Sequence, residues 1–225
     1  MRFIFFYLIV FLFLNSSHSS GQGFLADAIN PGRVYRELKW DNIIGSGLLF
    51  EDWHKARIKL VKGKLITGVM VNFDVYEHKA LYLNNNESFE FVDQLEYIET
   101  DYDQPEERKL FMNGFISNQF KPNTFVQVLN EGKYVLLKYV RKVLVDTKSY
   151  GSGNNDNKSI EMQSFYFISN NFSANPIKLS KSALEELAGS KKKELTAFLT
   201  SNNLSPKKEA DFIKALKFCN DFLNN

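Results

Sequence analysis

Alternation of apolar and polar residues dominates the chain from residue 51 to about residue 179. In its clearest stretch Val69, Val71, Phe73 and Val75 occupy every second position. A period of two sends successive side chains to opposite faces of a strand, so the pattern predicts half-buried β-strands. These strands follow one another without intervening helices, whereas parallel pairing would need long crossovers. The alternation therefore predicts an antiparallel meander.

Short polar segments divide this region into strands. Residues 130–133 include a glycine and predict a hairpin connection, and residues 170–171 predict another turn. The stretch 149–159 is rich in Gly, Asn and Ser, which predicts a flexible loop between two strands. The other expected strands are 58–60, 81–83, 89–91, 125–129, 134–145, 165–168 and 177–179.

The period becomes helical after residue 179. Ser182 and Glu185 have the spacing of a capping box, and Gly189 is placed to end that short helix. Ser190 predicts the start of a second helix that ends near residues 202–203, and Ser205–Pro206 predicts the start of a third. The last helix has an apolar stripe that requires burial. The stripe comprises Phe212, Ala215, Leu216, Cys219, Phe222 and Leu223.

The N-terminus has the pattern of an export signal. Met1 and Arg2 precede an unbroken apolar run at 3–14, and small polar residues follow. A run of this length is shorter than the roughly 20 residues that span a bilayer as a helix. The pattern predicts a secretory signal peptide cleaved after Ser19 or Gly21, the alternative being an uncleaved membrane anchor. The mature protein is then expected to be periplasmic or secreted, with no integral membrane span.

The sequence thus predicts an α+β protein with three segments. Residues 1–21 are the signal peptide, and residues 22–179 form a β-rich domain with a lead-in segment. Residues 180–225 form two or three C-terminal α-helices packed on the β-domain. The sheet is expected to be an antiparallel twisted β-meander or a partly closed barrel, because short consecutive strands favour that connectivity.

Charge and cysteine content exclude several classes of function. The 28 basic and 26 acidic side chains leave a net charge of +2, which argues against nucleic-acid binding. The only cysteine, Cys219, excludes an internal disulfide and multi-cysteine metal sites. Its place on an apolar stripe indicates a small buried side chain rather than a nucleophile. No phosphate-binding motif occurs, and we predict no cofactor.

The densest cluster of reactive side-chain types is Glu51, Asp52, Trp53 and His54. Carboxylates and an imidazole are acid–base and metal-binding groups, but neighbours in an extended chain point to opposite faces. We therefore interpret the cluster as a solvated structural corner and predict neither a catalytic nor a metal site. The alternative is a hydrolase that uses Glu51, Asp52 and His54. His78 lies in an expected turn, and the sequence does not establish a pairing that would join it to His54.

Aromatic residues make up 15% of the chain, with 21 Phe and 10 Tyr. Most Phe residues fall on expected inward-facing positions, which indicates a Phe-rich core. Exposed tyrosines are amphipathic and would suit a binding face for a glycan or a peptide, although the ligand-binding residues stay unidentified. The tyrosines in question are Tyr76, Tyr82, Tyr97, Tyr102, Tyr134, Tyr139, Tyr150 and Tyr166.

An ordered series of short segments resembles a known family. The segments are Trp40-Asp41, 44–53, 58–64, 71–76, 111–115 and the helical pair at 191–218. Together they are similar to a family of short exported proteins of uncharacterised function that is common in Bacteroidota. Family members usually carry another residue where this chain has Gly47. The resemblance implies an exported bacterial protein and adds no activity.

The leading functional hypothesis is a non-enzymatic binding or structural module of the bacterial envelope or exterior. It is favoured by the expected export, by the meander platform, by the aromatic content and by the lack of a complete catalytic motif. The expected partner is a protein or a glycan of the envelope, and not a nucleic acid.

Overall fold

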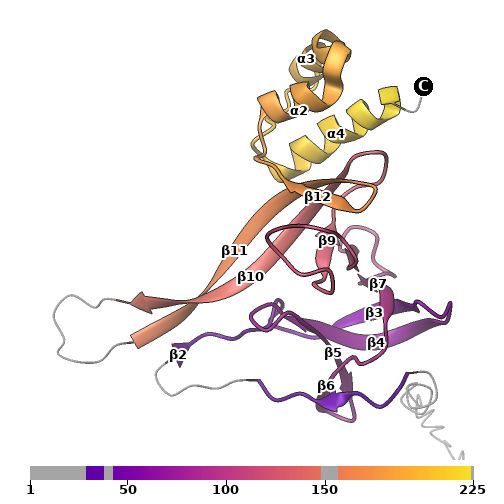
Figure 1. Cartoon of the computed structure of the whole chain (residues 1–225), viewed down its shortest axis with the longest axis vertical. Coiled ribbons are helices and arrows are strands. Elements are labelled where there is room, and N and C mark those ends of the chain that lie inside the picture. The colour runs from indigo at the N-terminus through magenta and orange to yellow at the C-terminus, as the bar shows by residue number, and fades with distance from the viewer. Residues whose placement is uncertain (1–28, 38–42, 148–156, 224–225) are drawn as a thin grey trace, which may run out of the picture.

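The computed structural model describes residues 29–37, 43–147 and 157–223 (Figure 1). The expected signal peptide and most of the expected loop at 149–159 lie outside these residues. One sheet is followed by α-helices, which confirms the predicted α+β class. The strands are β1 (Arg33–Val34), β2 (Ile43–Ile44), β3 (His54–Leu60), β4 (Leu65–Asp74), β5 (Lys79–Asn84), β6 (Glu87–Glu90), β7 (Leu95–Thr100), β8 (Lys109–Met112), β9 (Val126–Val128), β10 (Val135–Thr147), β11 (Asn157–Asn170) and β12 (Ser173–Pro176). The helices are α2 (Lys181–Ala188), the short 3₁₀ helix η1 (Gly189–Lys191), α3 (Lys192–Ser201) and α4 (Glu209–Leu223).

The sheet is open and almost entirely antiparallel. Its spatial order is β1-β6-β5-β4-β3-β7-β8-β9-β10-β11-β12, and β2 pairs in parallel with β11. Strands consecutive in sequence are neighbours from β3 to β6 and again from β7 to β12, which confirms the predicted meander in two runs. Between the runs, the chain crosses back from β6 to the other side of β3, where β7 pairs.

The crossing from β6 to β7 requires the sheet to curl. Glu90 and Leu95 are five Cα steps apart, which gives a reach of at most about 18 Å. The four interstrand spacings between β6 and β7 would cover about 19 Å in a flat sheet. The strands therefore bend around a common core that includes Ile58, Ile98 and Phe111.

A bulge in β4 changes which residues face that core. Ala56 pairs with Val69 and Arg57 with Thr67, which leaves Gly68 as an extra residue at φ +80°. Glycine adopts this left-handed conformation without the steric cost that a Cβ would add. The extra residue shifts the alternation, so that Ile66 faces the core before the bulge and Val69, Val71 and Phe73 face it afterwards.

The C-terminal helices pack on the far end of the long β10–β11 hairpin (Figure 1). Leu136 and Ile168 of the hairpin share one buried cluster with Phe212 and Leu216 of α4 and with Leu184 of α2. This cluster buries Phe212, Ala215, Leu216 and Cys219 of the apolar stripe predicted for the last helix.

Several local predictions need correction. Strand β12 occupies 173–176 rather than 177–179, because the turn after β11 is tight and pairing resumes at once. Strand β11 already begins at Asn157, inside the expected loop. The cap of α2 is Ser180, whose Oγ accepts from the Ala183 amide at 3.2 Å, whereas Gly189 ends the helix as predicted. Ser190 lies within η1 and caps no helix, because the chain turns directly from α2 into α3.

Candidate ligand-binding site

The predicted cluster at Glu51, Asp52 and His54 does not converge. Glu51 and Asp52 are exposed in a turn before β3, while His54 opens that strand and is half-buried. The His54 Nδ1 atom lies 2.8 Å from Oδ2 of Asp101, a buried residue in the turn after β7. Because β7 pairs with β3, that turn returns to the start of β3, a neighbour that the sequence did not reveal.

Structural contacts surround the His54–Asp101 pair. The Phe50 ring packs on the imidazole with centroids 4.2 Å apart, and the Asp101 amide donates to the Lys55 carbonyl at 2.7 Å. The interpretation of His54 as a solvated corner residue is therefore wrong. The pair ties the end of β7 to the beginning of β3. Among the described residues, no group of three or more His, Cys, Asp and Glu side chains is arranged to hold a metal ion.

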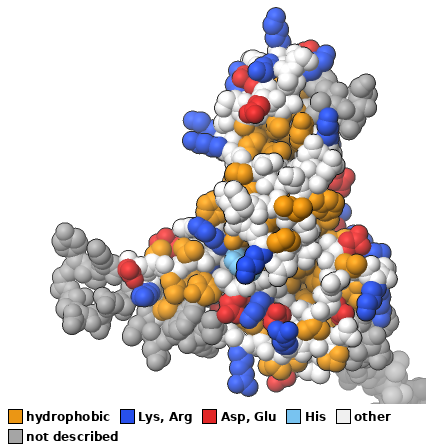
Figure 2. Space-filling view, in the orientation of Figure 1, with side chains coloured by type: hydrophobic (Ala, Val, Ile, Leu, Met, Phe, Trp, Pro, Cys, Tyr) orange, Lys and Arg blue, Asp and Glu red, His pale blue; other side chains and the backbone are white. Residues whose placement is uncertain are grey.

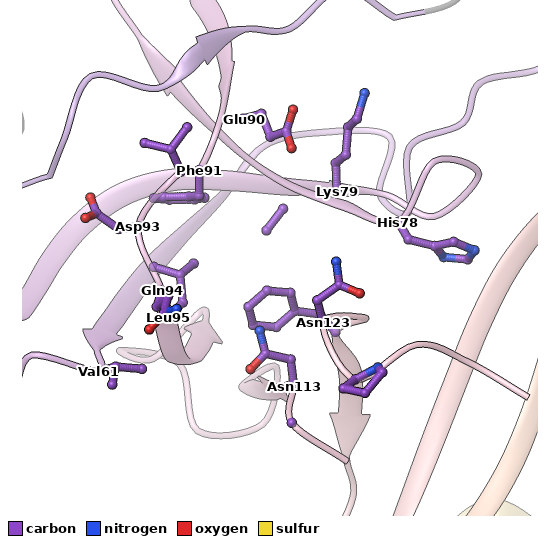
Figure 3. Close-up of a pocket in the computed structure, with 15 residues that line it drawn as sticks. Val61, His78, Lys79, Glu90, Phe91, Asp93, Gln94, Leu95, Asn113 and Asn123 are labelled. Atoms are coloured by element: carbon purple, nitrogen blue, oxygen red, sulfur yellow. The ribbon is translucent and has the colours of Figure 1, made fainter. Parts of the chain in front are cut away.

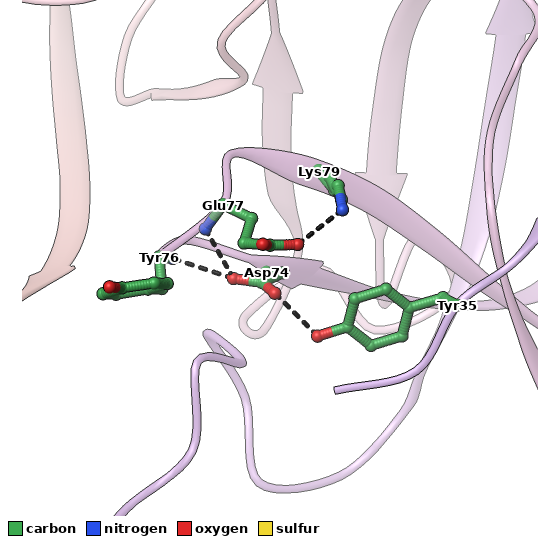
Figure 4. Close-up of polar contacts among 5 residues, drawn as sticks. All are labelled: Tyr35, Asp74, Tyr76, Glu77 and Lys79. Atoms are coloured by element: carbon green, nitrogen blue, oxygen red, sulfur yellow. Dashed lines mark hydrogen bonds and ion pairs between the residues drawn. The ribbon is translucent and has the colours of Figure 1, made fainter. Parts of the chain in front are cut away.

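A second polar cluster surrounds the buried carboxylate of Asp74 at the end of β4 (Figure 4). Its Oδ1 accepts from the amides of Tyr76 and Glu77 at 2.9 and 2.8 Å, and its Oδ2 accepts from the Tyr35 hydroxyl at 2.6 Å. Burial and the neighbouring carboxylate both raise the pKa of Tyr35. Both carboxylate oxygens are thus engaged inside the protein, so Asp74 fastens the lead-in segment to the β4–β5 turn.

The lead-in segment is held by two further residues. The Glu37 carboxylate accepts from the Ser46 hydroxyl at 2.5 Å and from the Gly47 amide at 3.0 Å. The Lys142 ammonium donates to the carbonyls of Ser46 and Leu48, and burial lowers its pKa. A Cβ on Gly47 would lie 3.0 Å from Oδ1 of Asp74, so a side chain there would displace the cluster. These groups bind one another and fix the lead-in segment on the sheet.

A cavity of about 530 Å³ lies beside the β6–β7 connection, and we call it the crossover pocket (Figure 3). Its size lies within the range of roughly 300–1,000 Å³ typical of small-molecule sites. Apolar side chains and polar side chains contribute to its lining in comparable measure. The apolar members are Val61, Ala80, Phe91, Val92, Leu95, Pro122 and Phe125, and the polar members are His78, Lys79, Glu90, Asp93, Gln94, Asn113 and Asn123.

Hydrogen bonds hold the crossover wall in place. The Phe91 amide donates to the Ala80 carbonyl at 3.1 Å, and the Val61 amide donates to the Gln94 carbonyl at 3.0 Å. Between these points, the Asp93 carboxylate accepts from the backbone amide of Asn30 at 2.7 Å and from its side-chain amide at 2.5 Å. The connection is therefore fastened to β5, to the end of β3 and to the lead-in segment.

The connection between β8 and β9 forms the opposite wall. The Gly114 amide donates to the Pro122 carbonyl at 2.6 Å, which brings Asn113 and Asn123 together. Gly114 has φ +88°, a conformation that suits glycine. Figure 3 shows the side chains of Asn113 and Asn123 on one side of the cavity and Gln94 on another. Within the described residues, no hydrogen bond engages these three side-chain amides.

Charged groups in the pocket are largely offset. The Lys79 ammonium lies 2.5 Å from Oε2 of Glu77. The His78 imidazole lies at φ +60° in the β4–β5 turn, beside the Tyr139 ring, and burial lowers its pKa. The imidazole is therefore mainly neutral at pH 7. The sequence correctly placed His78 in a turn, and the structure brings it beside Tyr139 rather than His54.

The tyrosines considered for a binding face do not share one environment. Tyr82 and Tyr139 are buried, Tyr150 lies outside the described residues, and the half-buried Tyr166 lines the larger groove between β11, β12 and α2. The aromatic rings of the crossover pocket are instead those of Phe91 and Phe125, which are half-buried. The sequence analysis missed the pocket because its residues come from five separate segments that share no motif.

A larger and more open groove, about 1,040 Å³, lies between β11, β12 and α2. Its one carboxylate, that of Glu209, accepts from Lys138 at 2.8 Å and from the Tyr166 hydroxyl at 2.6 Å. The groove therefore holds its carboxylate in an internal ion pair and hydrogen bond.

No protein-family model matches this chain, and comparisons with curated proteins and with solved structures likewise find no match. Among the described helices, none combines the length and apolar character needed to cross a membrane.

Proposed function

We propose that this protein is a non-enzymatic binding module of the bacterial envelope or exterior, and that the crossover pocket holds its ligand. One observation carries the proposal. Three uncommitted side-chain amides, from Gln94, Asn113 and Asn123, line one cavity whose walls are fixed by hydrogen bonds. A pre-formed apolar pocket with a few placed polar groups is the usual form of a small-molecule site.

The titratable groups in the pocket favour binding over catalysis. Both oxygens of Asp93 accept hydrogen bonds from Asn30, so this carboxylate serves to hold the wall. Glu90 and His78 line the cavity, but no hydrogen bond joins them within the described residues. A general acid–base pair requires groups that are coupled to each other or to the substrate at about 2.6–3.2 Å.

The alternative function, hydrolysis by Glu51, Asp52 and His54, has less support. Glu51 and Asp52 are exposed, and His54 pairs with Asp101 instead. These three residues line neither the crossover pocket nor the larger groove.

The proposed location follows from the sequence. The apolar run at 3–14, with its positive start and small polar exit, is the pattern of an export signal. The resemblance to exported proteins of Bacteroidota supports the same location.

NMR spectroscopy of the isotope-labelled mature chain tests the proposal. The chain is titrated with neutral oligosaccharides, short peptides, nucleosides and short fatty acids. We expect one class to shift the resonances of Gln94, Asn113 and Asn123, and to be recovered unchanged after incubation. Asn123→Ala should weaken the shifts, whereas Asn118→Ala, an exposed residue of the same connection, should not.

Two results would contradict the proposal. One is that no class shifts the pocket resonances. The other is that the ligand is cleaved and His54→Ala abolishes the cleavage, which would establish the hydrolase instead.

A further inference from the structure

A second cavity adjoins the crossover pocket. It measures about 230 Å³, and its lining includes Asn30, Leu60 and Lys62. Four residues line both cavities, namely Val61, Val92, Asp93 and Gln94. The second cavity is smaller than a typical independent ligand site, so we expect a ligand to occupy it only as an extension of the crossover pocket.

The wall shared by the two cavities presents apolar surface to water. Val61 is 58% exposed and Val92 is 44% exposed, and both belong to the few large hydrophobic side chains that are exposed in the described part of the chain. The β6–β7 connection, which carries Val92, is held in place by the Asn30–Asp93 hydrogen bonds. Covering these side chains with a ligand would remove apolar area from water, which is favourable. The exposed Gln94 amide lies in the same wall.

The lining of the two cavities carries no excess of positive charge. Glu90 and Asp93 supply two carboxylates, and Lys79 and Lys62 supply two ammonium groups, of which Lys79 is already paired with Glu77. Such a lining gives no net attraction to a polyanion and favours an uncharged ligand.

The polar lining suits a ligand that is rich in hydroxyl groups. Each amide of Gln94, Asn113 and Asn123 offers both donors and an acceptor. Neighbouring hydroxyls of a sugar offer the same two functions in return. The rings of Phe91 and Phe125 provide apolar surface for the C–H face of a sugar ring.

We propose that the crossover pocket and the adjoining cavity are two subsites for an uncharged oligosaccharide. The sugar chain crosses the shared wall of Val61, Val92 and Gln94, with at least one unit on each side. This inference rests on the proposed binding function and adds the class of the ligand and its minimum length.

The test is calorimetry and NMR with a defined panel of probes. The panel contains cello-, malto-, laminari- and manno-oligosaccharides of one to six units, galacturonic acid oligomers of the same lengths, and tetra-alanine. For one neutral series we expect affinity to rise about tenfold from one unit to three and then to level off, since a tenfold change corresponds to about 1.4 kcal/mol of added contacts. The galacturonic acid oligomers should bind at least tenfold more weakly.

Two variants separate the subsites. Asn123→Ala, in the crossover pocket alone, should lower affinity about tenfold or less at every length, as expected for one lost hydrogen bond. Lys62→Ala, in the second cavity alone, should weaken only the longer oligomers and so flatten the length dependence. Asn118→Ala and Lys192→Ala are matched exposed controls and should leave affinity unchanged.

Each contrary outcome has a distinct meaning. Two results would overturn the two-subsite arrangement. One is an affinity that does not depend on oligomer length, and the other is a loss of affinity for single sugars in the Lys62→Ala variant. Pocket shifts with tetra-alanine or another non-sugar class, and none with neutral sugars, would overturn the saccharide assignment and leave the binding function standing. No pocket shift with any probe class would overturn both.

Discussion

Asparagine side chains make different hydrogen bonds in two regions of the molecule, the curled sheet around the β6–β7 crossing and the helical end. In the helical end, the Asn220 side chain donates to the carbonyls of Glu131 and Tyr134 and accepts from the Tyr134 amide at 2.9 Å. In the crossover pocket, the side-chain amides of Asn113 and Asn123 make no hydrogen bond with another described residue. The asparagine side chain thus links two backbone segments in one region and lines a cavity in the other.

Charged side chains lie on the surfaces of both regions. Figure 2 shows lysine side chains projecting from the helical end, hydrophobic side chains along the middle of the molecule and the projecting hairpin, and further basic and acidic side chains on the curled sheet. Beneath that charged surface, the helices bury a complete apolar cluster with Leu136 and Ile168. In the proposed function, the helical end contributes stability and the curled sheet carries the binding surface.

The largest expected effect comes from removing α4. A chain that ends at Asn203 would expose the apolar surfaces of Leu136, Leu184 and Leu195, which α4 covers. Isolated helices of this length are marginal in water, so α4 and its partners depend on each other. We expect the truncated chain to aggregate or to lose its cooperative thermal transition in calorimetry. A cooperative transition at the wild-type temperature would show that α4 is an appendage.

Phe212→Ala tests the same cluster with one side chain. The ring is fully buried, and truncation of a buried Phe typically costs about 3–5 kcal/mol. Urea denaturation should show a loss of that size in the free energy of unfolding. Phe172→Ala, at an exposed ring, is the matched control and should change little. A loss below about 1 kcal/mol for Phe212→Ala would contradict the assignment of α4 to the core.

Alkaline pH should destabilise the helical end. Burial raises the pKa of Cys219 from 9.0 to about 11. A raised pKa in the folded state gives stability that is present below the unfolded value of 9.0 and is lost as pH rises towards 11. The two units correspond to about 3 kcal/mol. Tyr166 and Tyr35, whose pKa values are also raised by burial, act in the same direction at higher pH.

Cys219→Ala isolates the thiol contribution in that pH titration. Denaturation midpoints measured between pH 8 and pH 11 should fall less steeply in this variant than in the wild type. Parallel curves for the two proteins would show that the thiol does not contribute.

Asn220→Ala should destabilise the protein by about 1–3 kcal/mol, because it leaves the Tyr134 amide without its acceptor, although the Tyr134 carbonyl keeps a hydrogen bond from the Asn130 side chain. The measurement is again the free energy of unfolding in urea. An unchanged value would mean that water replaces the side chain at this joint.

Asn113→Ala is the counterpart in the crossover pocket and should have the smallest effect on stability. With no hydrogen bond to another described residue to lose, it should change the free energy of unfolding by less than about 0.5 kcal/mol. It should nevertheless weaken ligand binding. Equal destabilisation by Asn113→Ala and Asn220→Ala would remove the distinction between the two regions.

Local patterns in the sequence predicted much of the fold and little of the candidate site. The alternation at Val69, Val71 and Phe73 identified β4, and Gly189 identified the end of α2, because period and turn chemistry act over a few residues. The predicted strand at 177–179 was wrong by a few positions, since pairing partners rather than composition decide where a short strand lies. His54 was misinterpreted because its partner, Asp101, is 47 residues away.

The sequence by itself determined the α+β class, the antiparallel connectivity within each run of strands and the need to bury the last helix. These properties follow from side-chain periods and from the glycine at the end of α2. The tertiary structure alone decided that β7 returns beside β3, and that the short crossing curls the sheet. That return brings Val61, Gln94 and Asn123 around one cavity. Residues so far apart in sequence meet only because distant strands pair and because the short crossing segment limits how far apart β6 and β7 can lie. Local sequence patterns predict neither property.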